Sequence, residues 1–181
     1  MLLAMKINFP DSRPVYLPRC NQLLLLLLGI AMQSPVIAVS NTATVTAKII
    51  STISLVNQSG MVFGDISSSN SPGTVVLNPS GSRLSTGGAG INSTVTSGPA
   101  TFDVSGDPNV VYAISLPISV VLTKLSGDTM VVDDFNSLPA NTGITDPGGE
   151  QLLFVGATLN VGVKQVFGSY TGNMIVTVEY N

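Results

Sequence analysis

The sequence lacks most of the side chains that carry catalysis and metal binding. Its 181 residues include one cysteine, no histidine and no tryptophan. A disulfide therefore cannot form within the chain, and structural zinc sites lack their usual ligands. A serine or threonine nucleophile would have no histidine to serve as its base. We therefore expect no enzyme and no zinc centre.

Charged residues are also scarce, at 9% of the chain. From residue 39 onward, four basic residues stand against nine acidic ones, a net charge of −5. So little positive charge argues against nucleic-acid binding, and no basic amphipathic helix indicates a membrane surface. The carboxylates lack calcium-loop spacing and lie where turns are expected, so we predict neither metal nor cofactor. They are Asp103, Asp107, Asp133, Asp134, Asp146 and Glu150.

The first 38 residues have the pattern of a secretory signal peptide. Basic residues precede a ten-residue apolar run, Leu23–Met32, and Cys20 lies before that run. The run is too short to span a bilayer, which needs about 20 apolar residues. We predict a signal peptide over 1–38, with cleavage after Ala38 or Ser40, and one domain over 39–181. A buried helix is the alternative.

The remainder of the sequence alternates between short apolar segments and turn residues. Val110–Leu116, Ile118–Leu122 and Leu153–Val161 alternate apolar and polar positions. Gly106–Pro108 and Ser126–Asp128 are typical turns, and Gly81–Gly90 predicts a turn or bulge. About eight or nine short strands at this spacing predict an all-β sandwich or barrel.

The two ends of this domain carry the strongest alternation. In Asn41–Ile50, the apolar positions are Ala43, Val45, Ala47 and Ile49, and the same phase continues through Ile53 and Leu55. We predict one long strand here, or two strands joined near Ser51. In the last fourteen residues, Met174, Val176, Val178 and Tyr180 alternate with polar positions, broken by Ile175. This pattern predicts a final strand with one buried face.

The tail resembles that of chaperone–usher pilin subunits, which combine alternating apolar residues, a penultimate tyrosine and a glycine fourteen residues from the end. Tyr180 and Gly168 occupy those positions. The stretch Val45–Ile49 with Met61–Asp65 is similar to the opening of spore-coat-protein-U-like pilins. The Gly-x-Tyr-x-Gly and Val-x-Val-x-Tyr ending also resembles an uncharacterised bacterial family of secreted domains.

The pilin resemblance implies an immunoglobulin-like sandwich of about eight strands that lacks its final strand. It implies a subunit of a bacterial surface filament, exported through the periplasm to the cell surface. A periplasmic chaperone, an usher and neighbouring copies would be its partners, with no nucleic acid and no membrane. Ala43, Val45, Ala47 and Ile49 would form the donor strand. The acceptor edge, which also binds the chaperone, would comprise Gly168, Met174, Val176, Val178 and Tyr180.

A different function fits the same residues. A complete sandwich can also end on a strong strand, with Ala43–Ile49 pairing in its own sheet. The chain would then be a self-complete secreted or cell-surface adhesive domain, and no strand would be exchanged between copies.

Overall fold

The computed structural model describes residues 39–181, so the predicted signal peptide and Cys20 lie outside the described residues. The described part contains strands and no helix, and it divides into two units between Thr46 and Ala47. Within residues 39–181, no helix is long and apolar enough to cross a membrane. The all-β prediction is confirmed.

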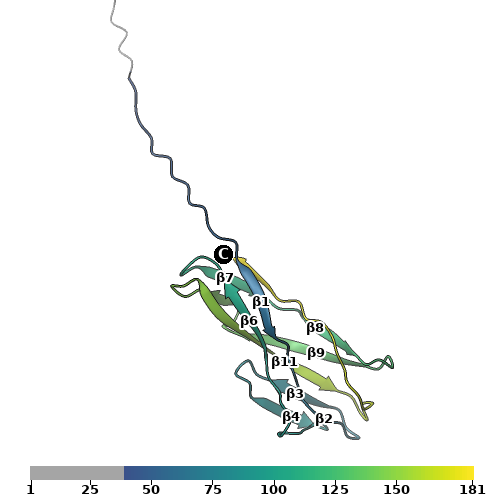
Figure 1. Cartoon of the computed structure of the whole chain (residues 1–181). Coiled ribbons are helices and arrows are strands. Elements are labelled where there is room, and N and C mark those ends of the chain that lie inside the picture. The colour runs from purple at the N-terminus through teal and green to yellow at the C-terminus, as the bar shows by residue number, and fades with distance from the viewer. Residues whose placement is uncertain (1–38) are drawn as a thin grey trace, which may run out of the picture. The chain divides into compact units, whose positions relative to one another are not determined.

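Twelve strands follow one another in the second unit (Figure 1). They are β1 (Ser54–Ser59), β2 (Ile66–Ser67), β3 (Gly73–Leu77), β4 (Arg83–Gly87), β5 (Gly90–Ile91), β6 (Ala100–Ser105), β7 (Val111–Ser115), β8 (Ser119–Thr123), β9 (Thr129–Leu138), β10 (Thr142–Ile144), β11 (Glu150–Val161) and β12 (Thr177–Tyr180).

The larger sheet has seven strands and is built around β11. The first half of β11 pairs with β6 and the second half with β3, both antiparallel. β9 pairs with residues 154–160 of β11, so it must lie along the opposite edge from β6 and β3. β1 continues the sheet beyond β6, β4 beyond β3, and β8 beyond β9. β1 is therefore an edge strand of this sheet.

A smaller sheet of three strands packs over part of this large sheet. Its order is β10-β7-β12, with β12 at one edge. Its inward residues, including Tyr112, Ile114 and Val178, pack on a cluster formed by β6 and β11 (Phe102, Val104, Leu153 and Val155). The two layers enclose one half of the core in the manner of a sandwich.

The other half of the core lies under irregular chain. A second cluster of buried residues comes from β3, β9 and β11 and includes Val75, Val132 and Leu159. Partly buried apolar residues pack against it, and three of them, Met61, Phe63 and Tyr170, lie outside any strand. The others are Ile66, Ile91, Leu122 and Phe135. The smaller sheet thus covers the large sheet over part of its length.

Several expected elements differ in the structure. The alternating stretch 41–50 forms no strand, and the first strand begins at Ser54. β1 runs through the polar residues Asn57–Ser59. The glycine-rich stretch 81–90, where a turn or bulge was predicted, contains β4, and the polar stretch 138–149 contains β10. These strands carry little apolar alternation because they lie at sheet edges, where one face or both are exposed to solvent.

Gly156 lies at the point where the neighbour of β11 changes from β6 to β3. A Cβ atom on this residue would lie 2.2 Å from the carbonyl oxygen of Leu77 and 2.8 Å from the carbonyl carbon of Asn78. Both atoms belong to the backbone, which cannot move aside as a flexible side chain can. The close approach of the two chains therefore requires glycine here.

We predict that Gly156→Ala lowers the free energy of unfolding by about 1–3 kcal/mol, because the added methyl group overpacks a buried site. Gly98→Ala is the matched control, since a Cβ there meets nothing within 4 Å. The control should stay within about 0.5 kcal/mol of the unmodified chain. Urea unfolding of the two variants measures the difference, and equal midpoints would contradict this packing.

Candidate functional site: an open groove between two edge strands

The edge strands of the two sheets come together at one end of the domain, which we call the base. The Tyr180 hydroxyl oxygen, on β12, accepts a hydrogen bond from the backbone N–H of Asp107 at 2.8 Å. A Cβ on Gly106 would lie 2.2 Å from this hydroxyl oxygen and 3.6 Å from the Cα of Ile53. Ile53 and Leu55 pack on the same cluster as Val178 and Tyr180. The base is therefore closed.

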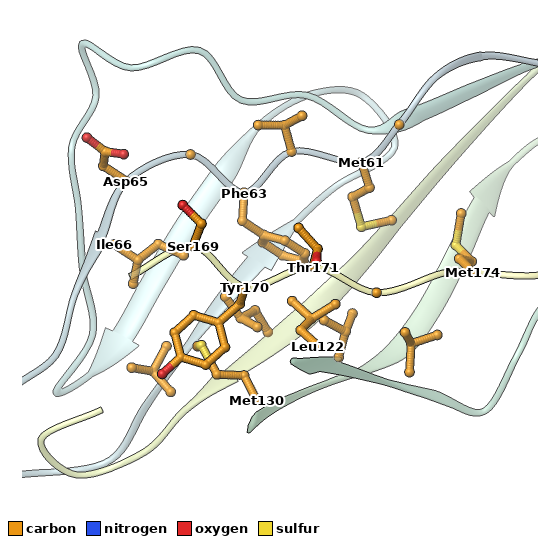
Figure 2. Close-up of a pocket in the computed structure, with 18 of the residues that line it drawn as sticks. Met61, Phe63, Asp65, Ile66, Leu122, Met130, Ser169, Tyr170, Thr171 and Met174 are labelled. Carbon is orange, nitrogen blue, oxygen red and sulfur yellow. The ribbon is translucent and has the colours of Figure 1, made fainter. Parts of the chain in front are cut away.

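Toward the opposite end, a cavity of about 1150 Å³ opens into the domain. Residues 60–68 form one wall and residues 165–174 form the other. Figure 2 shows Met61, Phe63 and Ile66 along the first segment, with Tyr170 and Met174 along the second. The volume exceeds the range of about 300–1,000 Å³ typical of small-molecule sites. We refer to this cavity as the groove.

The floor of the groove is the core of the large sheet. Six buried apolar side chains from β6, β9 and β11 line it, namely Ala100, Phe102, Met130, Val132, Leu159 and Val161. Among all the lining residues, Asp65 is the only acidic one and there is no lysine or arginine. A surface of this kind favours an apolar occupant, because a charged or unpaired polar group would lose its hydration there.

No strand pairing in residues 47–181 joins the two walls of the groove. In the second wall, Thr171 exchanges backbone hydrogen bonds of 2.8 and 3.1 Å with Thr123, while residues 172–176 belong to no strand. In the first wall, Val62 exchanges two bonds of 2.9 Å with Gly98, and β2 pairs with β5. Each wall is thus bonded to a neighbour on one side and open toward the other.

The five residues predicted for the acceptor edge fall into two groups. Gly168 and Met174 line the groove. Val176, Val178 and Tyr180 are half-buried and pack on the core beside it. Their alternation agrees with the sequence, since Ile175, Thr177 and Glu179 are exposed. The final strand is shorter than the alternation in the sequence predicted. Only Thr177–Tyr180 forms a strand, and this strand pairs with β7.

Gly168 has a positive φ of 139°, which an L side chain rarely adopts. A Cβ there would also lie 2.5 Å from Cε of Lys124. The aliphatic stem of Lys124 passes over this glycine, and its ammonium lies 5.4 Å from the centre of the Phe167 ring. Glycine at position 168 lets the second wall approach the β8–β9 turn closely.

The four residues predicted as the donor strand are exposed. Val45 is 92% exposed and Ile49 is 96% exposed, and residues 39–53 form no strand. Ala43 and Val45 belong to the first unit, and Ala47 and Ile49 to the second. Apolar side chains with strand alternation are therefore available here without a partner strand among the described residues.

Asp107 anchors the chain just after this segment. One of its carboxylate oxygens accepts hydrogen bonds from the backbone N–H of Ser51 at 2.9 Å and from the Ser51 hydroxyl at 2.6 Å. The Lys48 ammonium lies 3.9 Å from the other oxygen. The two bonds from Ser51, aided by Lys48, lower the pKa of Asp107 below its usual value. The loop at Asp107 thus contacts both Ser51 and Tyr180.

The groove walls were not foreseen as a site from the sequence. The segment that carries Met61, Phe63 and Ile66 is mostly irregular. Its closeness to residues 165–174 is a long-range contact that no local pattern encodes. Arg83 fixes this wall by donating hydrogen bonds to the carbonyl oxygens of Phe63 and Asn92. Arg83 lies in a polar, glycine-rich stretch of the sequence, and nothing in that stretch indicates that it holds this wall.

The sequence from Ile53 to Tyr180 matches a family described as a domain of unknown function (DUF4402). The chain belongs to this family. Its matched region contains both walls of the groove and the final strand, and it begins just after the exposed segment 39–52. The expectation of an uncharacterised domain family is met at this level. No curated protein and no solved structure matches the chain.

We predict that Tyr180→Phe destabilises the domain, because it leaves the partly buried N–H of Asp107 without an acceptor. An unsatisfied buried donor costs about 1–3 kcal/mol. The matched control is Glu179→Gln, whose side chain is exposed on the same strand. Urea unfolding should separate the two variants, and a Tyr180→Phe midpoint equal to that of the control would contradict the assignment.

The bonds from Ser51 to Asp107 predict a dependence on pH. The folded pKa of Asp107 is lowered, so these bonds are fully present above the unfolded value of 3.8 and are lost as the pH falls through the lower, folded value. The Ser51 amide proton should therefore titrate in nuclear magnetic resonance spectra with a midpoint below 3.8. Asp107→Ala should abolish this titration. A midpoint at or above the unfolded value would contradict the prediction.

Proposed function

We propose that this chain is a structural, non-enzymatic subunit of a bacterial surface filament, whose copies join by exchanging a strand. The observation that carries the proposal is the open apolar groove between two walls that lack a strand pairing with each other. A groove of this kind accepts an added strand, which gains backbone hydrogen bonds along an edge and side-chain contacts in the floor. The proposed occupant is the segment Ala43–Ile49 of another copy.

The dimensions of the segment and the groove agree. An extended chain advances about 3.3 Å per residue, so the six steps from Ala43 to Ile49 span about 20 Å. The second wall of the groove, residues 165–174, covers nine steps, which is at most about 30 Å in the same terms. Alternate side chains of a strand point to the same face. Ala43, Val45, Ala47 and Ile49 would therefore enter the groove together, leaving Thr44, Thr46 and Lys48 in solvent.

The energies are sufficient for durable assembly. Burial of Val45 and Ile49 contributes about 1.5–3 kcal/mol each, and the two alanines contribute less. Each new backbone hydrogen bond adds about 0.5–1.5 kcal/mol. The gross gain of about 10–15 kcal/mol is comparable to the stability of a whole domain. Because donor and acceptor are different surfaces, the contact is head-to-tail and extends into a filament.

In this proposal the chain is exported, and the leader is removed before assembly. An open apolar groove with unpaired edges invites aggregation during transit. A periplasmic chaperone would fill the groove until an usher brings in the next copy. The strand pattern at both ends of the domain and the groove between its edge strands support this sequence of events.

A self-complete secreted or cell-surface adhesive domain is the second candidate. It is favoured by the pairing of β12 with β7 in the same chain and by the Tyr180 hydrogen bond that closes the base. This candidate predicts a soluble monomer that refolds without a chaperone. The experiments below separate the two functions.

Free peptide of residues 41–50 should bind the groove. The receptor is the full chain with Val45→Asp and Ile49→Asp, which cannot donate because an aspartate would be buried without a partner. At a peptide concentration 100 times the Kd, binding should stabilise the chain by about 2.7 kcal/mol. Thermal unfolding measures this as a rise in Tm. A peptide with the same two aspartates is the control, and no rise with the unmodified peptide would contradict the proposal.

Self-association should depend on one face of the segment. The unmodified chain should form a ladder of SDS-resistant oligomers. Val45→Asp with Ile49→Asp should abolish this ladder, whereas Thr44→Asp with Thr46→Asp should leave it in place. The two double variants add the same charge within the same few residues and differ only in the face that carries it. An equal loss of oligomers in both would contradict strand insertion.

A further inference from the structure

The end of the domain opposite the base carries an exposed apolar surface, which we call the tip. It combines Leu125 from the turn between β8 and β9 with Val163, Val166 and Phe167 from the connection between β11 and β12. Leu125 is 105% exposed and Phe167 is 91% exposed. Figure 1 shows the β8–β9 turn far from the C-terminus. Single exposed apolar residues are ordinary, but several on adjoining turns indicate a contact surface.

The connection at the tip is held in place by hydrogen bonds. Lys164 donates its backbone N–H to the carbonyl of Ser69 at 2.8 Å. The Gln165 side-chain amide donates to the carbonyl of Thr129 at 3.1 Å, and the Tyr170 hydroxyl donates to the carbonyl of Val166 at 2.7 Å. The apolar side chains are therefore presented to solvent by a supported loop.

The tip and the base carry opposite charge. The tip contains Lys124 and Lys164, two of the four cations in residues 39–181, with Asp128 beside Lys124 at 3.8 Å. The base carries one cation, Lys48, beside an excess of acids. These acids are Asp107, Asp146, Glu150 and Glu179, on the loops around 107 and 146–150 and on β12. The two ends are thus complementary to each other.

The length of chain between the donor segment and its domain fixes where a donating copy must lie. Four residues separate Ile49 from Ser54, the start of β1, and the five steps between them span at most about 18 Å. The base of the donor therefore lies next to the point where its Ile49 enters the groove. At the base of the acceptor, that position is taken by the acceptor's own residues 48–51, beside Asp107. The donor must therefore enter from the tip.

We propose that the tip of each copy packs against the acidic base of the copy that donates a strand to it. This inference rests on the proposed function. The inserted segment then runs antiparallel to residues 171–180. Leu125 and Phe167 are covered by the loops of the donor's base, and Lys124 and Lys164 face its carboxylates. The joint between copies is a second interface beside the groove, made of different residues.

Two engineered cysteines test whether the tip of the acceptor meets the base of the donor. Both are introduced into full chains that carry Cys20→Ser, which removes the only native cysteine. The acceptor carries Val45→Asp, Ile49→Asp and Leu125→Cys, so it receives a strand but gives none. The donor carries Pro147→Cys, in the exposed loop of the base. After the two are mixed, a short bismaleimide should join them into a covalent heterodimer.

The matched control exchanges the two cysteines between the same chains. Pro147→Cys on the acceptor and Leu125→Cys on the donor place the thiols at ends that do not meet, so the heterodimer should be lost. Equal yields of the covalent heterodimer in the two arrangements would overturn the proposal that the donor enters at the tip of the acceptor. An intact donor–acceptor complex without cross-link in the first arrangement would overturn the tip–base contact and leave the strand exchange standing. The absence of any complex would overturn both.

A second measurement follows the contact without cysteines. Leu125→Ser with Phe167→Ser in the acceptor should leave binding of the 41–50 peptide unchanged but raise the dissociation rate of the whole donor chain at least tenfold. At an ionic strength of about 1 M, where the screening length falls to about 3 Å, association of the whole donor should slow while peptide binding changes little. Equal dissociation rates for the variant and the unmodified acceptor would overturn the proposal.

Discussion

An apolar sheet face must be covered, and this fold covers its large sheet unevenly. The three-stranded sheet lies over the half built from β6 and the start of β11. Over the other half, irregular segments reach across and leave the groove between them. Among residues 47–181, no strand pairing joins the two walls over that half. The groove, its open walls and its apolar floor all follow because the three-stranded sheet does not extend over this half of the large sheet.

The uneven cover of the large sheet also explains why the base and the tip of the domain differ. At the base, Tyr180 and Ile53 bring the edges of both sheets together. The loop of Asp107 is hydrogen-bonded to Tyr180 and to Ser51. Toward the tip, β8 belongs to the large sheet while β7 belongs to the small one, and the chain crosses between layers at 116–118. Residues 171–180 follow this crossing, bonded to β8 at Thr171 and to β7 from Thr177 onward. The second wall of the groove and the strand that continues it are therefore only partly paired.

The sequence predicted those parts of the fold in which burial follows a local period. β11 alternates from Leu153 to Val161, and the structure buries those residues as expected. β4 and β10 were missed because polar edge strands carry no such period. The segment 41–50 has the period without the strand, since alternation shows which face is apolar but not whether a partner is present. The walls of the groove, Met61 to Ile66 and Gln165 to Met174, meet only through tertiary contacts, so no local pattern could place them together.

In the proposed assembly, the bonds between Ser51 and Asp107 would also affect whether a copy binds its own segment or that of a neighbour. These bonds hold the C-terminal end of the exposed segment at the base of its own domain. If that segment folded back into its own groove, its chain direction would match that of residues 171–180, giving a parallel ladder. A segment arriving from another copy at the tip would give an antiparallel one, which is the slightly more stable pairing. In the proposed assembly, the direction of the inserted chain would therefore favour a segment from another copy over the copy's own segment.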